Sequence, residues 1–226
     1  MNGGTALHAA AIGGSREAVR RLLQAGAPAD AVDYAGRSAI HYAARGGSGK
    51  CIRTLCRACA DLERTNVLGW TPLHVASNFS HPGAINALLK IGARASPVDG
   101  SGCTPLHLAA DRLGEDVDGC RCKECTKQHA RKLRAMRLLL AHGALPSAGD
   151  CNGATPAHVS AAHDCSEGIR MLRRARANLW GADVNGFTPL RISRAGRQAS
   201  RAARTLLFMD GSLPRNVAAA ASRPRD

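Results

Sequence analysis

Four residues that could bind a metal ion lie within ten positions of one another near the middle of the chain. They are Cys120, Cys122, Cys125 and His129, in the pattern Cys-x-Cys-x-x-Cys-x-x-x-His. Cys122 and Cys125 have a spacing that is common among zinc ligands, and Cys125 and His129 would share one face of a helix. Four such ligands are enough for a closed tetrahedral zinc site.

Two alternatives to this site remain open at the level of sequence. The ligands could be completed by His163 and Cys165 in a composite site. The cysteines could also be free thiols on a solvated loop, because short motifs often match by chance and the Cys-x-Cys pair is tight for one metal ion. A structural zinc is therefore one interpretation of the segment, and no other cofactor is predicted.

The remaining sequence does not predict catalysis. It contains no phosphate-binding Gly-rich loop, no Gly-x-Ser-x-Gly turn and no His-Glu-x-x-His helix. We therefore predict that the protein is not an enzyme.

The elements that would position these residues follow from an internal repeat. The tetrapeptide Thr71-Pro72-Leu73-His74 has matches or near matches that begin at Thr5, Ser38, Thr104, Thr155 and Thr188. Successive copies are offset by 33, 33, 33, 51 and 33 residues, so the fourth of six units carries 18 extra residues. A glycine stands two positions before each copy. Self-similarity at such a period is typical of stacked repeat architectures.

The six phased copies resemble the ankyrin repeat over nearly the whole chain. The resemblance implies an all-α fold, a solenoid of stacked helix-turn-helix units with projecting hairpin loops. We expect the array over residues 1–212 and a short disordered tail at 213–226. The expected repeats are 1–32, 33–65, 66–98, 99–149, 150–182 and 183–212, with the insertion near 114–132.

Local chemistry agrees with this expectation. The Thr-Pro pair suits a helix N-cap followed by the first helical turn, and glycines such as Gly26 suit the left-handed end of the second helix. Because residues 121–141 contain no Gly or Pro, we expect the second helix of repeat four to be extended backwards, with a basic face.

Several repeats lack a glycine at a position where the others have one. Cys59 and Arg176 replace the helix-ending glycine, and Ser80, Asp164 and Arg197 replace the glycine between the helices. We expect repeats two, five and six to be the less stable ones, because a left-handed backbone costs glycine least.

The resemblance also implies a partner protein bound on a concave surface of hairpin tips and first helices. The recurring histidines, His8, His41, His74, His107 and His158, belong to the repeat framework and are interpreted as structural. The predicted contact residues, with a hot spot on repeats two and three, are Tyr34, Arg37, Arg45, Leu68, Trp70, Asn78, Phe79, Asp111, Arg112 and Phe187. The alternative is that Trp70 and Tyr34 only cover neighbouring loops.

The charge balance suggests a second class of partner. The chain has 31 basic and 17 acidic residues, a net charge of +14, and the C-terminal half is the more basic. That half could bind nucleic acid or an acidic protein, although few aromatic side chains are available there for base stacking. With no long apolar run and no export signal, we expect a monomer in the cytoplasm or nucleus without a membrane partner. The leading prediction is a non-enzymatic protein-interaction scaffold.

Overall fold

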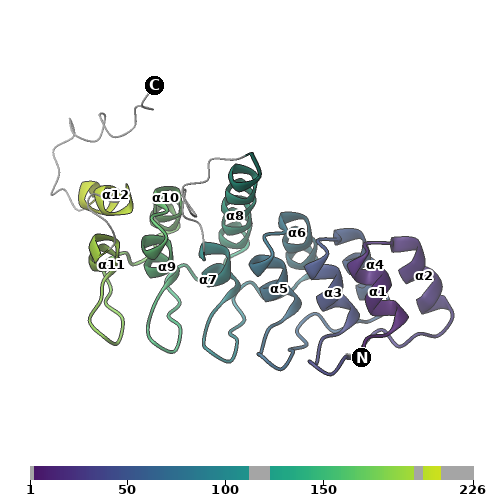
Figure 1. The fold of residues 1–226 in the computed structure, drawn as a ribbon. Helices are drawn as coiled ribbons and strands as arrows, with labels where there is room; N and C mark the ends of the chain where they lie inside the picture. The colour runs from purple at the N-terminus through teal and green to yellow at the C-terminus, as the bar shows by residue number, and fades with distance from the viewer. Residues whose placement is uncertain (1–2, 112–122, 196–200, 210–226) are drawn as a thin grey trace. The chain divides into compact units, whose positions relative to one another are not determined.

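The chain folds as helices joined by hairpin loops. The computed structural model describes residues 3–111, 123–195 and 201–209 (Figure 1). Within these ranges there are twelve helices and no strand, apart from one isolated antiparallel bridge between Val32 and Ser38. The helices are α1 (Ala6–Ile12), α2 (Arg16–Gln24), α3 (Ala39–Arg45), α4 (Gly49–Arg57), α5 (Pro72–Asn78), α6 (Pro82–Ile91), α7 (Pro105–Ala110), α8 (Lys123–Ala141), α9 (Pro156–Ala162), α10 (Ser166–Arg174), α11 (Pro189–Ala195) and α12 (Arg201–Met209). The predicted all-α repeat fold is confirmed.

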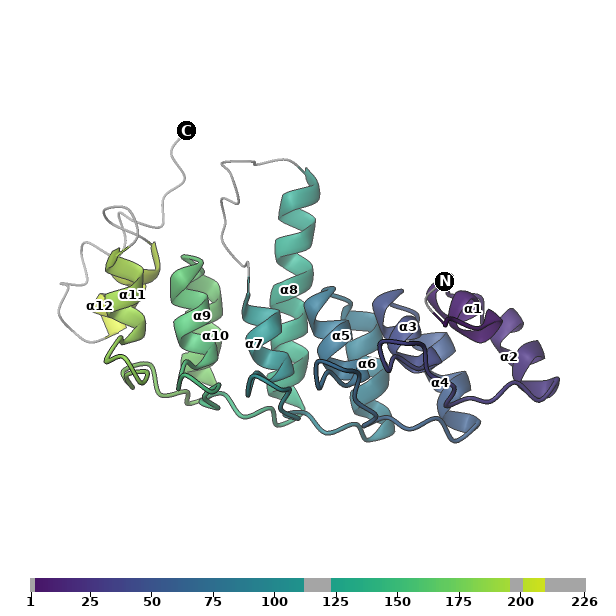
Figure 2. The same cartoon turned by 60° about the horizontal axis from the view of Figure 1, so that its bottom comes forward.

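The helices group into two compact units, which are described separately. Unit 1 comprises Met1–Ala109 and Ala130–Leu145, and unit 2 comprises Ala110–His129 and Pro146–Asp226. Within unit 1, the first helices α1, α3 and α5 pack side by side in one layer, and the second helices α2, α4 and α6 form the other (Figure 2). Unit 2 pairs α9 with α10 and α11 with α12. None of the described helices combines the length and apolar character needed to cross a bilayer.

The first helix of repeats one to five begins at a reciprocal cap between a Thr or Ser and the histidine three residues later. In repeat one, Nδ1 of His8 accepts a hydrogen bond from the backbone amide of Thr5 at 2.9 Å, and the Thr5 hydroxyl lies 2.8 Å from the same nitrogen. The same cap occurs at Ser38, Thr71, Thr104 and Thr155. These contacts satisfy amide groups that a helix start leaves without a partner.

The second helices begin at a different cap. Oγ of Ser15 and of Ser48 accepts from a backbone amide three residues ahead, and Sγ of Cys165 takes the same role in α10. Helix α8 is longer than its equivalents, with 19 residues from Lys123, as the absence of Gly and Pro predicts. Its predicted basic face is only partly exposed, because Lys132 is buried.

The core is built from residues at equivalent repeat positions. In unit 1, Leu7, Ile40, Leu73 and Leu106 from the first helices are almost fully buried. Val19, Ile52, Ile85 and Met136 occupy the matching place in the second helices, and Ile169 does so in unit 2. Burying one such side chain is worth about 1.5–3 kcal/mol. One repeat contributes few of them, so stability depends on stacking against a neighbour.

Two hydrogen bonds recur between consecutive repeats. Nε2 of the framework histidine donates to a backbone carbonyl 29 residues ahead, as for His8 with Arg37, His41 with Trp70, His74 with Cys103 and, in unit 2, His158 with Phe187. This confirms the structural interpretation of these four histidines. The second contact was not predicted: polar side chains after the second helix, Asp30, Glu63, Ser96 and Ser147, accept from a backbone amide of the next repeat.

The residues that replace glycine keep the glycine conformation. Cys59, Ser80, Asp164 and Arg176 all have positive φ, between 51° and 61°. Arg197 lies outside the described residues. The backbone of the repeat is therefore preserved at a conformational cost, which for a residue with a Cβ atom is about 1–2 kcal/mol.

Candidate functional site

The hairpin tips are organised by one Asp or Asn side chain each. Oδ1 of Asp33 accepts from the amides of Ala35 and Arg37, and Asn66 and Asp99 do the same in the next two hairpins. Such turns are a known use of Asx side chains. Adjacent tips in unit 1 are also joined through the backbone, because the amide of Val67 donates to the carbonyl of Ala35 and that of Gly100 to Leu68. The tips of unit 1 therefore form one continuous ridge.

This ridge exposes large apolar side chains. Tyr34 is 82% exposed, Val67 72% and Leu68 59%. Because the Val67–Ala35 bond holds two tips together, the three side chains come from adjoining loops. Clustered exposed apolar groups, unlike scattered ones, indicate a contact surface. We call Tyr34, Val67 and Leu68 the tip ridge.

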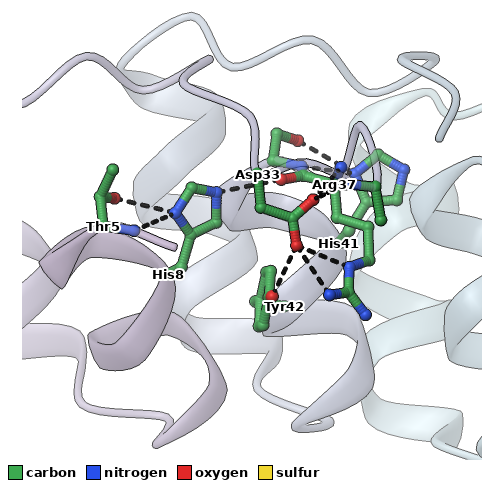
Figure 3. Close-up of polar contacts among 8 residues, drawn as sticks. Thr5, His8, Asp33, Arg37, His41 and Tyr42 are labelled. Atoms are coloured by element: carbon green, nitrogen blue, oxygen red, sulfur yellow. Dashed lines mark hydrogen bonds and ion pairs between the residues drawn. The ribbon is translucent and has the colours of Figure 1, made fainter. Parts of the chain in front are cut away.

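A buried ionic cluster holds the base of the second hairpin. Oδ2 of Asp33 accepts from Nε of Arg37 at 2.8 Å and from the hydroxyl of Tyr42 at 2.8 Å (Figure 3). The Arg37 guanidinium also lies 5.1 Å from the centre of the Tyr42 ring. Burial alone would raise the pKa of Asp33, but the bonds from Arg37 and Tyr42 lower it to about 2. Arg37, a predicted contact residue, is thus engaged in supporting the hairpin.

Arg45 has a different environment from Arg37. Its guanidinium lies 5.2 Å from the centre of the Phe79 ring, and both side chains are exposed. Arg45 pairs with no carboxylate among the residues that the structure describes. Asn78, which precedes Phe79, is half-buried. The sequence-predicted residues Arg45, Asn78 and Phe79 therefore come together at the end of first helices, with an available positive charge over an aromatic ring.

The structure places Trp70 against a neighbouring loop, as in the alternative interpretation of this residue. Its indole Nε1 donates to Oδ2 of Asp99 at 2.9 Å, so it ties the third hairpin to the fourth. The side chain is partly buried. Tyr34, for which the same alternative was open, is largely exposed.

The remaining predicted contact residues are in unit 2 or undescribed. Phe187 is 38% exposed and lies under the guanidinium of Arg191, 4.5 Å from the ring centre. Oδ1 of Asp111 is 2.8 Å from Nε2 of His163. Arg112 lies outside the described residues.

Only some of the predicted zinc ligands lie within the described residues. Cys120 and Cys122 lie outside the described residues, as does the side chain of Cys125. His129 lies on α8, and its Nδ1 is buried with no hydrogen-bond partner among the residues that the structure describes. Across the described ranges, no three His, Cys, Asp or Glu side chains are grouped so that they could hold a metal ion.

The alternate ligands already have roles in their own repeat. His163 contacts Asp111, and Cys165 caps α10 from a buried position. Burial raises the pKa of the Cys165 thiol to about 11, which disfavours the thiolate that zinc requires.

Cys56 and Cys59, at the end of α4, form a second Cys-x-x-Cys pair in addition to Cys122 and Cys125. Burial raises the pKa of Cys56 to about 11, whereas a redox-active pair needs a lowered one. Cys56 therefore has the environment of a structural thiol.

Sequence reasoning missed the role of Asp33 and Tyr42. Asp33 lies in a hairpin loop, and Tyr42 lies inside a helix next to the framework histidine. Only their separation of nine residues, with Arg37 between, could have suggested a shared cluster.

Comparison with known families supports the repeat assignment. The family description "Ankyrin repeats (3 copies)" matches residues 1–66 and 57–121, which together cover more than half of the chain. No match was found among curated proteins.

Proposed function

The chain belongs to the ankyrin-repeat family, and on that premise we propose that it is a non-enzymatic adaptor that binds a protein partner through unit 1. Ankyrin repeats are generally protein–protein interaction modules and are typically without enzymatic activity. The contact surface in this proposal is the tip ridge together with Arg45 and Phe79.

The exposed tip ridge is the observation that carries the proposal. Tyr34, Val67 and Leu68 keep most of their surface in water although they are large and apolar. A partner that covers them gains roughly 25 cal/mol for each Å² of apolar surface removed from water. The backbone bonds between the tips hold the ridge in place before binding, so little ordering cost falls on the complex.

Arg45 and Phe79 would add specificity to this surface. A guanidinium over an aromatic ring offers both an apolar face and hydrogen-bond donors, and Arg and aromatic residues are enriched among binding hot spots. Arg37 and Trp70 stabilise the loops of this surface through their hydrogen bonds to Asp33 and Asp99. In the proposal they act mainly by positioning the loops.

The experiment compares three full-length proteins as bait in a nuclease-treated lysate of the source cell. The Tyr34→Ser/Leu68→Ser variant removes the tip ridge, and Ile91→Ser/Leu145→Ser removes exposed apolar side chains elsewhere in unit 1. The partner that the parent captures is then titrated with each protein. We expect the affinity of the tip variant for this partner to be at least about 30-fold weaker than that of the parent. The control variant should bind like the parent. Equal binding by all three proteins would contradict the proposal.

A second candidate is binding of nucleic acid or an acidic protein by the basic C-terminal half. It is favoured by Arg173, Arg174 and Arg176 of unit 2, which are exposed at the end of α10. Loss of polyanion binding when these three arginines are neutralised would support it.

A further inference from the structure

Every carboxylate of unit 1 accepts hydrogen bonds from other groups of the same unit. Unit 1 contains six acidic residues, and each accepts at least one bond from the protein: Glu17, Asp30, Asp33, Asp61, Glu63 and Asp99. Asp30 and Glu63 bind backbone amides of the next repeat, and Asp61 and Asp99 bind amides of their own loops. The carboxylates of this unit therefore all take part in intramolecular hydrogen bonds.

The positive charge of unit 1 is distributed differently. Its second helices carry exposed Lys and Arg residues that form no ion pair with any part of the chain that the structure describes: Lys50, Arg53, Arg57, Lys90, Arg134 and Arg137. We call these six residues the basic outer face. Glu17 is the one acidic residue on the second helices of unit 1, and Arg20 and Arg21 bind it at 2.7 and 2.9 Å. Within the described residues, therefore, no carboxylate forms an ion pair with the basic outer face.

The helix geometry gathers these charges on one side. In α4, Lys50, Arg53 and Arg57 follow an i, i+3, i+7 pattern, whereas Cys51, Ile52 and Leu55 are fully buried on the other side. In α8, Arg134 and Arg137 are exposed, while Ala135, Met136 and Leu139 are buried. Helix α6 lies between α4 and the unit 1 part of α8 in both views and adds Lys90 (Figures 1 and 2).

The size of the basic outer face suits a linear polyanion. Packed helices are about 8–10 Å apart, so the charges from α4 to α8 extend over about 20 Å. A nucleic-acid strand rises about 3.4 Å per phosphate, so this distance corresponds to about six nucleotides.

The absence of apolar anchors distinguishes between classes of partner. Among the outward-facing residues of α4, α6 and the unit 1 part of α8, the one large apolar side chain exposed is Ile91, at 36%. Protein interfaces need buried apolar or aromatic anchors, and membrane-surface helices need an apolar face to insert. Binding to phosphates needs only positive charge. We propose that the basic outer face of unit 1 binds the phosphate backbone of a nucleic acid without sequence preference, on the side of the second helices rather than on the tip ridge.

The test is fluorescence anisotropy of the full-length protein with labelled random-sequence RNA and duplex DNA of about 24 nucleotides or base pairs. Salt is varied from about 0.05 to 0.3 M, because phosphate contacts release counterions and make binding salt-dependent. The Arg53→Gln/Arg57→Gln/Arg137→Gln variant removes three charges from the basic outer face. The matched control, Arg173→Gln/Arg174→Gln/Arg176→Gln, removes three exposed charges from unit 2. Thermal melts followed by circular dichroism establish that each variant is folded.

The parent should bind at least one of the two probes, and binding should weaken steeply with salt. The outer-face variant should lose about 2 to 3 from the slope of log affinity against log salt, and affinity at 0.1 M salt should fall at least about tenfold. The unit 2 control should change much less. The Tyr34→Ser/Leu68→Ser variant should bind the probes like the parent, which separates this inference from the proposed protein-binding function.

Three results would overturn the inference. The first is no binding of either probe at the lowest salt concentration. The second is an equal or larger loss in the unit 2 control, which would assign the contact to the C-terminal half. The third is tighter binding of poly-glutamate, or of vesicles of phosphatidylserine and phosphatidylcholine, than of either nucleic acid.

Discussion

Nε2 of His41 lies 3.0 Å from the backbone carbonyl oxygen of Trp70, so one imidazole joins two consecutive repeats. Its other nitrogen, Nδ1, accepts from the amide of Ser38. Because an amide can only donate, the ring proton must be on Nε2, and the imidazole is held neutral. Burial lowers the pKa of His41 from 6.5 to about 4 and also lowers that of His74.

Acid should therefore destabilise the repeats by protonating the buried imidazole of His41. A histidine whose pKa falls on folding contributes its full stabilisation above the unfolded value of 6.5, and loses it as the pH falls toward 4. For His41 alone, the loss between pH 7 and 5 is about 2 kcal/mol. Asp33, with its pKa lowered to about 2, does not contribute in this window.

Urea unfolding at pH 7, 6 and 5 checks this expectation. The free energy of unfolding of the parent should fall as the pH falls. The His41→Gln variant should be less stable at pH 7 but should lose about 2 kcal/mol less than the parent over the same range. Parallel pH curves for the two proteins would show that His41 is not responsible.

The buried carboxylate of Asp33 should matter more for stability than any exposed one. The Asp33→Ala variant leaves Arg37, the Tyr42 hydroxyl and two backbone amides without their acceptor, at a cost of about 3 kcal/mol or more. The Asp61→Ala variant, which removes an exposed carboxylate, should cost less than about 1 kcal/mol. Chemical denaturation of both variants measures the difference, and similar values for the two would be inconsistent with the cluster.

Glycine should stabilise the repeats that lack it. Cys59 and Arg176 both have φ of 61° and exposed side chains, so Cys59→Gly and Arg176→Gly relieve backbone strain without removing a recorded contact. After the greater flexibility of glycine in the unfolded chain is subtracted, each should gain about 0.5–1 kcal/mol.

The reverse change supplies the control for these glycine variants. Gly26 occupies the position equivalent to Cys59, at φ 86° with open space around it, so Gly26→Arg tests the backbone alone. It should lower the melting temperature, whereas the two glycine variants should raise it. Asp164→Gly should gain less, because the Asp164 carboxylate accepts a bond from the amide of Ala202.

The insertion should hold zinc if Cys120, Cys122, Cys125 and His129 act together. We propose that protein purified without added zinc carries about one zinc ion per chain, since four ligands complete a tetrahedral site. Elemental analysis should find the metal in the parent and in Cys151→Ser, an exposed cysteine outside the motif, but not in Cys122→Ser/Cys125→Ser. Negligible metal in every protein would eliminate the zinc site and leave free thiols.

The repeat was predictable because its framework residues act within short distances along the chain. Thr71 and His74 are three residues apart and cap the same helix, so the tetrapeptide reports the helix start directly. The left-handed turns were also predictable, since Cys59 and Arg176 stand in register with glycines.

The contact surface was less predictable because its chemistry depends on residues from different repeats. Trp70 and Tyr34 both looked like exposed aromatic anchors in the sequence. Trp70 donates a hydrogen bond to Asp99, whereas the Tyr34 side chain forms no hydrogen bond with the part of the chain that the structure describes. Likewise, Arg37 is bound to the carboxylate of Asp33, whereas Arg45 is exposed beside the Phe79 ring. The basic outer face could not be recognised from the sequence, because the sequence does not show that the carboxylates of unit 1 form hydrogen bonds elsewhere.

The bond between Oγ of Ser96 and the amide of Leu145 shows how the long fourth repeat fits its neighbours. Equivalent bonds join residues 31 apart, such as Asp30 and Asp61, whereas this one spans 49 and encloses the 18 additional residues. The third and fourth repeats therefore keep the contact found between shorter repeats, although 18 more residues separate its two partners in the sequence. Foreign sequence of varied length could be grafted at this point, so the insertion can diversify independently of the scaffold that carries it.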